Sequence, residues 1–68
     1  MISYRIFWDT LNDRGISQYA LYTDHNISRS LLDKLRKDKN IEVFTLGKLC
    51  SILNCRIEDI VEYIPDDK

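Results

Sequence analysis

Residues 17–37 read SQYALYTDHNISRSLLDKLRK and contain two short helical patterns separated by a polar turn. Ser17 and Ser28 each occupy an N-cap position, where a side-chain oxygen accepts hydrogen bonds from the free N–H groups of a first helical turn. Asn26 lies between the two patterns, and asparagine tolerates the positive φ of a sharp turn. The stretch therefore predicts a helix over about residues 18–24, a tight turn, and a helix over about residues 28–37.

The second of these helices has two unlike faces. On a helical wheel, Leu31, Leu32 and Leu35 fall together, which predicts a face directed at the core. The opposite face is polar and mostly basic, with Arg29, Ser30, Asp33, Lys34 and Lys37. A short helix of this kind, preceded by a helix and a tight turn, fits the major groove of DNA. The alternative is an ordinary helix surface that is exposed to water and binds no DNA, because such surfaces show the same pattern of polar and charged residues.

The rest of the chain also shows helical spacing. We expect a first helix over about 2–13, stopped by Gly15, and further helices over about 43–53 and 56–63. The last is expected to bury Ile57, Ile60, Val61 and Ile64 and to stop at Pro65. Strand signals are weak, since no alternating run is bounded by hairpin turns. The sequence predicts an all-α fold of five helices, with one domain over 1–64 and a short acidic tail over 65–68.

Composition excludes several classes of protein. The 68 residues are 44% hydrophobic and 31% charged, with two glycines and one proline, which argues against a disordered or collagen-like chain. No apolar run is long enough to span a membrane, and the first residues lack the apolar core of a signal peptide, so we expect a cytoplasmic protein. The net charge of −1 is uneven, with +3 over residues 28–40 and −4 over 57–68. A basic middle can attract nucleic acid because binding responds to the local field.

Other chemistry is poorly supported. Cys50 and Cys55 have the spacing C-x4-C without a second pair, and the single histidine, His25, lies in the turn. We therefore predict no metal site, no cofactor and no catalytic residue. No small-molecule effector is evident from the sequence. Five aromatic residues are spread over the first two expected helices and are expected in the core and on its flanks rather than in a stacking platform, namely Tyr4, Phe7, Trp8, Tyr19 and Tyr22.

The spacing of nearly the whole chain resembles the Cro/repressor-type (XRE) helix-turn-helix family, in particular a small stand-alone subgroup. The resemblance rests on the turn and helix quoted above, on KDKNI at 37–41, on TLGKLCSILNC at 45–55 and on RIEDIVEYIPD at 56–66. It implies a double-stranded DNA-binding transcriptional regulator, with a repressor favoured. No enzymatic activity is expected. The alternative is a protein-interaction module, or an antitoxin-like partner, without independent DNA reading.

The resemblance also implies site residues. Arg29, Ser30 and Lys34 match the positions that read bases. The positions along the DNA backbone are matched by Gln18, Ser28, Lys37, Lys39, Asn40 and Thr45. Gln18 additionally matches a residue that braces the recognition helix.

Four further residues affect how closely this chain is expected to follow the family's mode of DNA binding. Tyr22 stands where the family commonly has alanine, which would widen or rotate the two central helices. Asp38 stands where many relatives have glycine, and Glu42 stands where a Ser or Thr cap is usual. Asp33 either accepts from a cytosine amino group or pairs with Arg29 and Lys37, and we favour the pairing.

A single domain of this size contacts few bases. Sequence-specific binding of DNA therefore favours a homodimer on a palindromic site. Half-sites would then lie about 34–36 Å apart. The apolar helix predicted over residues 56–63 is the candidate for the two-fold interface, the alternative being that its apolar face is used entirely by its own core.

Overall fold

The computed structural model describes residues 1–66. Within that range it contains four α-helices, one turn of 3-10 helix and two short strands. In chain order these are β1 (Ile2–Ser3), α1 (Arg5–Asp13), α2 (Gln18–Asp24), α3 (Arg29–Arg36), α4 (Val43–Leu53), η1 (Ile57–Asp59) and β2 (Glu62–Tyr63). The helices predicted at 18–24 and 43–53 are confirmed with these bounds, and the one predicted at 28–37 is confirmed within a residue at each end.

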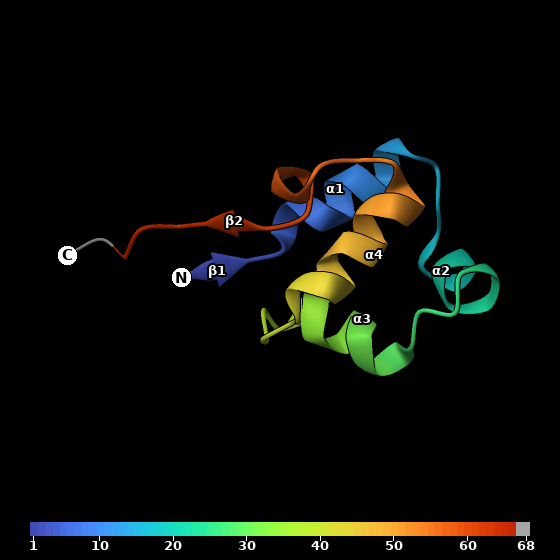
Figure 1. The fold of residues 1–68 in the computed structure, drawn as a ribbon, viewed down its shortest axis with the longest axis horizontal. Helices are drawn as coiled ribbons and strands as arrows, with labels where there is room; N and C mark the ends of the chain where they lie inside the picture. Colours follow the sequence, from blue (N-terminus) through green and yellow to red (C-terminus); the bar gives the residue numbers. More distant parts are fainter. Residues whose placement is uncertain (67–68) are drawn as a thin grey trace.

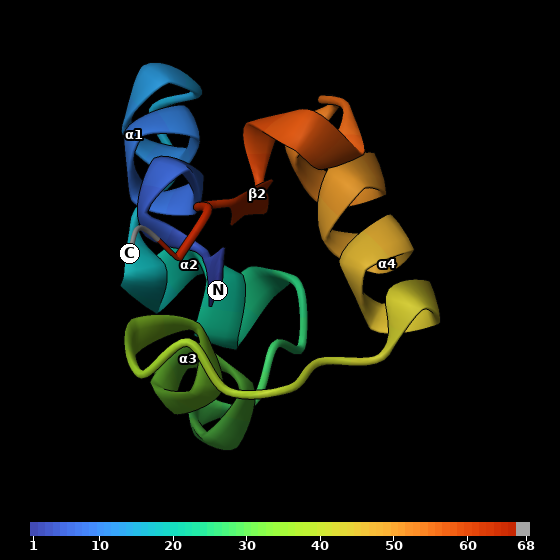
Figure 2. The same ribbon diagram turned by 90° about the vertical axis from the view of Figure 1, so that its left-hand side faces the viewer.

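The four helices surround one core. Figure 2 shows α1 and α4 on opposite sides of the view, and both views place α3 at the lower end of the molecule, where α4 begins. The strands pair at the side of the molecule away from α2 (Figure 1). The first turn of α4 therefore shares one end of the molecule with α3.

The turns and caps follow the sequence signals. The Oγ atoms of Ser17 and Ser28 accept hydrogen bonds from the backbone N–H groups of Ala20 and Leu31, each at 3.0 Å. Asn26 has φ of 57° between α2 and α3, which is the left-handed backbone predicted for the turn. These short polar side chains fix where each of the two central helices begins and how the chain turns between them.

The core consists of large aliphatic and aromatic side chains from every helix. Its fully buried members are Phe7, Leu21, Ile27, Leu35, Leu49, Leu53 and Ile60. On α3, Leu32 and Leu35 are buried and Leu31 is half-buried, while the polar residues of the opposite face are exposed. The wheel drawn from the sequence is confirmed.

The prediction of a fifth helix over 56–63 is wrong. The segment makes a single 3-10 turn at η1 and then enters β2. Only Ile60 of its predicted core residues is fully buried, and Ile57 is 42% exposed. The Asp59 carboxylate accepts from the Arg56 N–H at 3.1 Å and closes the turn. Beyond it, the backbone groups pair with the N-terminal segment, so tertiary pairing overrides the helical spacing.

The same pairing shortens the first helix. Ile2 and Ser3 lie opposite Tyr63 and Glu62 in an antiparallel ladder, and the Ile64 N–H donates to the Met1 carbonyl at 2.8 Å. Ile2 is exposed, and α1 begins only at Arg5. The expected helix over 2–13 is therefore correct for residues 5–13 and wrong for residues 2–4.

The predicted acidic tail, 65–68, lies partly outside the described residues, which end at Asp66. Across those described residues, each helix falls short of the length and apolar character needed to cross a membrane.

We predict that Leu35→Ala lowers the free energy of unfolding by about 2–5 kcal/mol, because the side chain is 1% exposed and its loss leaves a cavity. Leu31→Ala is expected to cost less, because Leu31 is half-buried. Urea unfolding followed by circular dichroism measures both. Phe44→Ser is the control, with a change within about 0.5 kcal/mol, because Phe44 is 91% exposed. A Leu35→Ala protein as stable as this control would contradict the packing of α3.

Candidate nucleic-acid interface

Helix α3 presents the three predicted base-reading residues to solvent. Arg29, Ser30 and Lys34 are all exposed. The buried leucines on the other face fix this orientation, and the Ser28 cap fixes where the helix begins. A hydroxyl that accepts a hydrogen bond still has its own proton to donate. Ser28 is exposed, so it keeps one donor toward a ligand.

A groove of about 330 Å³ lies between α2 and α3. It is lined by Gln18, Tyr19, Tyr22, Arg29, Leu32 and Arg36. The Arg29 guanidinium carbon lies 4.6 Å from the centre of the Tyr22 ring, which is a cation–π contact. The groove thus brings together the predicted residues Gln18 and Arg29 around an aromatic wall.

Arg36 closes the other side of this groove. Its guanidinium donates to the Gln18 Oε1 atom and lies 5.8 Å from the centre of the Trp8 ring. These contacts join α3 to the start of α2 and to α1. Arg36 was not among the predicted site residues. Its position seven residues after Arg29, about two helical turns, could have placed it on the same side of the helix.

A second hollow of about 290 Å³ lies between α3 and the start of α4. It is lined by Leu31, Lys34, Asn40, Ile41, Glu42 and Thr45. Three predicted contacts, Lys34, Asn40 and Thr45, therefore lie together. Glu42 is the N-cap residue of α4, but its side chain makes no capping hydrogen bond. Its carboxylate is exposed beside the three polar residues.

The remaining predicted residues do not line either hollow. Ser30 is exposed on α3, and Lys37 and Lys39 belong to the turn that follows it. The Lys37 Nζ atom lies 3.3 Å from the Asp33 carboxylate, whereas the Arg29 guanidinium lies over the Tyr22 ring. The expected pairing of Asp33 is thus confirmed for Lys37 and wrong for Arg29.

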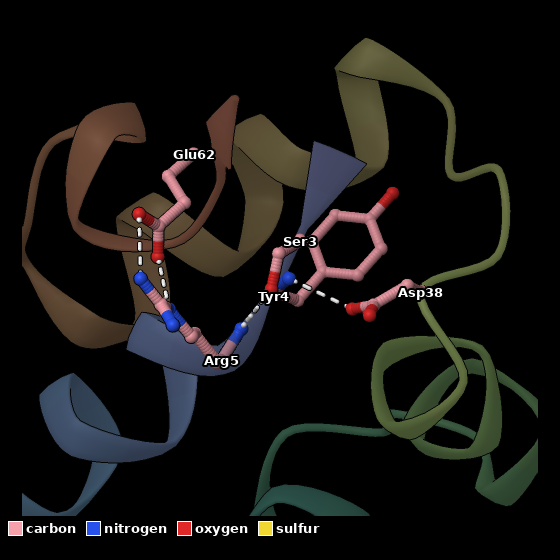
Figure 3. A network of polar contacts seen from close by, with 5 residues as sticks. All are labelled: Ser3, Tyr4, Arg5, Asp38 and Glu62. Atoms are coloured by element: carbon pink, nitrogen blue, oxygen red, sulfur yellow. Dashed lines mark hydrogen bonds and ion pairs between the residues drawn. The ribbon is translucent and has the colours of Figure 1, made fainter. Parts of the chain in front are cut away.

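Tyr4 holds the turn after α3 in place. Its backbone N–H donates to the Asp38 carboxylate at 2.9 Å (Figure 3). Its hydroxyl donates to the Lys39 carbonyl at 2.8 Å. Asp38 has φ of 54°, a left-handed conformation that explains why glycine would also suit this position. On the other side of Tyr4, Arg5 pairs with Glu62 of β2 at 2.8 Å (Figure 3).

A metal site requires a set of ligand side chains that lie close together. Across residues 1–66, no group of three His, Cys, Asp or Glu side chains gathers at one place. Cys50 and Cys55 are free thiols, and burial, then the neighbouring Cys50, raises the pKa of Cys55. A raised pKa lowers the thiolate fraction and hence the reactivity of Cys55.

A helix, a tight turn and a second helix with an exposed basic face define a helix-turn-helix protein. Comparison with family models matches residues 7–66 to the Cro/C1-type HTH DNA-binding domain. The chain therefore belongs to the Cro/C1-type helix-turn-helix family, which confirms the resemblance read from the sequence.

One solved structure is similar over nearly the full length. The crystal structure of the transcriptional regulator VanUg is similar to this chain with 34% sequence identity and a TM-score of 0.82, and the match covers 96% of this chain and 87% of that one. The search of curated proteins found no significant match.

We predict that alkaline pH destabilises the fold through Tyr4. Burial, and then the negative charge of Asp38, raises the pKa of Tyr4. The folded protein thus holds the phenol proton more tightly than the unfolded chain, whose tyrosines ionise near pH 10. This contribution to stability is complete below about pH 10 and is lost as the pH rises through the folded pKa.

Urea midpoints collected from about pH 8 to 11 test this effect. Tyr4→Phe is expected to cost about 0.5–1.5 kcal/mol at neutral pH and to flatten the alkaline decline. The matched control is Tyr63→Phe, which changes an exposed tyrosine. Parallel declines in the wild type and in Tyr4→Phe would refute the role assigned to Tyr4.

Proposed function

We propose that this protein is a transcriptional repressor that inserts α3 into the major groove of double-stranded DNA. The main observation in support of this proposal is the exposed, mostly basic face of α3. This face is directed outward because Leu32 and Leu35 on the opposite face are buried in the core. The family and the similar regulator structure support DNA binding as the activity. A small domain of this kind represses by occupying its site.

Base reading is assigned to Arg29, Ser30 and Lys34. Arg29 would donate two hydrogen bonds to a guanine, which contributes about 1–3 kcal/mol of discrimination. Lys34 lies one turn further along α3 and has no ion-pair partner within residues 1–66, so its charge is available to DNA.

Phosphate contacts are assigned to residues on both sides of α3. Gln18 and Ser28 lie on the α2 side, and Lys37, Lys39, Asn40 and Thr45 follow the chain into α4. Such contacts set orientation and register and contribute most of the salt dependence. Lys37 is expected to contribute less than Lys39, because Asp33 already pairs with it.

A homodimer on palindromic DNA would supply the specificity that one copy lacks. The helix expected as its interface is not formed. The surface available there is instead that of the two strands, where Ile2 and Tyr63 are exposed. We keep the homodimer as part of the proposal and place its interface on this sheet.

One observation favours the alternative of a protein-interaction module. Val43 and Phe44 are adjacent, largely exposed residues at the start of α4, next to the acidic Glu42. An apolar pair beside a carboxylate suits a protein surface better than a phosphate backbone. Charge reversal on α3 separates the two functions, since it affects DNA reading and leaves Val43 and Phe44 intact.

We predict that selection from random duplex DNA at low salt enriches a palindrome. The variant Arg29→Glu with Lys34→Glu is expected to lose this enrichment, because it places two negative charges against the groove. Sequencing of the retained DNA is the readout, and circular dichroism checks that the variant is folded.

The matched control is Lys48→Glu with Arg56→Glu, which makes the same change in net charge at exposed residues outside the proposed interface. It should retain the enriched sequence. Enrichment of a single half-site would argue for a monomer on DNA. If folded wild-type protein enriches no sequence, the DNA-binding proposal is contradicted and the alternative of a protein-interaction module is favoured.

Salt dependence gives a separate prediction. The logarithm of the binding constant should fall linearly with the logarithm of salt concentration, with a slope of about −0.9 per neutralised phosphate. Lys39→Gln is expected to reduce the slope by about one such contact, while Lys48→Gln leaves it unchanged. Fluorescence anisotropy over a salt series measures both. A wild-type slope near zero would contradict the phosphate contacts.

A further inference from the structure

We propose that Tyr22 determines specificity by positioning the guanidinium of Arg29 for guanine. This inference rests on the proposed function and adds a residue outside α3 to it. Tyr22 lies on α2, and its ring faces the Arg29 guanidinium across a distance of 4.6 Å. Tyr22 is 40% exposed, so the ring forms part of the surface and is not sealed in the core.

The contact with Tyr22 leaves the donors of Arg29 without partners among the described residues. A guanidinium carries five N–H groups that point outward in its plane. The ring attracts the positive charge of the guanidinium, and this attraction does not require a hydrogen bond from any of these donors. Within residues 1–66, neither a hydrogen bond nor an ion pair involves the Arg29 side chain. Arg29 is therefore restrained in direction yet still able to donate two hydrogen bonds to a base.

The other arginine of the same groove is held in the opposite way. Arg36 donates a hydrogen bond from Nη2 to the Gln18 Oε1 atom, and its guanidinium carbon lies 5.8 Å from the centre of the Trp8 ring. This hydrogen bond joins α3 to α2. The groove thus contains one arginine that is tied to a neighbouring side chain by a hydrogen bond and one whose side chain, within residues 1–66, is held by an aromatic ring instead. The second arrangement suits recognition of a ligand outside the protein.

Both ends of the Arg29 residue are fixed as a result. The Ser28 cap sets its backbone at the start of α3, and the Tyr22 ring sets the far end of its side chain. A long side chain restrained before binding loses less conformational freedom when it meets its base. The expected gain is selective for the one base pair that Arg29 contacts.

Binding constants of single-substituted duplexes test the inference. The starting duplex is the sequence that the wild-type protein selects, and each base pair is replaced in turn. Tyr22→Leu keeps an apolar side chain in the groove and removes the aromatic face. It is expected to lower discrimination about two- to fivefold at one base pair, the one whose preference Arg29→Ala also abolishes. Tyr22→Phe keeps the ring and should retain the wild-type profile.

A double-mutant comparison separates this role from a general effect on the fold. In the Arg29→Ala background, Tyr22→Leu should change discrimination no further, because its effect passes through Arg29. Equal loss at every base pair, or equal loss in Tyr22→Phe and Tyr22→Leu, would overturn the inference. So would a rise in discrimination in Tyr22→Leu, since the contact with the Tyr22 ring would then withhold Arg29 from DNA.

The proposed function and this inference fail in different ways. Wild-type protein that selects no sequence overturns both. Wild-type protein that selects a sequence, with an unchanged profile in Tyr22→Leu, overturns the role of Tyr22 alone.

Discussion

Burial of the leucine face of α3 is the constraint on which the rest of the site depends. Leu32 and Leu35 pack into the core, so the rotation of the helix about its axis is fixed and its basic residues face solvent. Rotation by even a quarter turn would expose a leucine and bury a charge, both of which are costly. The core thus determines which side chains of α3 are presented at the surface, although its own residues are buried.

The central part of the fold was predictable because its signals are local. The caps at Ser17 and Ser28, the asparagine turn and the leucine spacing all act within a few residues, and the structure confirms each of them. The C-terminal segment was not predictable in this way. Its conformation depends on pairing between residues about 60 positions apart, and neither strand has a hairpin turn to signal it.

The candidate site likewise has a part that local sequence signals predict and a part that depends on tertiary packing. The helical wheel places Arg29, Ser30 and Lys34 on the outer face of α3, as the structure does. The contacts of Tyr22 with Arg29, and of Arg36 with Gln18 and Trp8, depend on how α1, α2 and α3 meet. Spacing along one helix cannot show them. The family pattern marked Tyr22 only as unusual, and the structure shows which side chain it faces.

The pairing of β1 with β2 has a consequence for how the chain acquires its structure during synthesis. Ile2 emerges from the ribosome about 60 residues before its partner Tyr63. The helices have mostly local contacts and can begin to form as the chain lengthens, but the sheet must wait until Tyr63 has been synthesised and is free to pair. Until then the core also lacks Ile60, which the finished fold buries completely. The nascent domain is therefore most exposed to proteases and to other chains in the interval between the formation of its helices and the release of Tyr63.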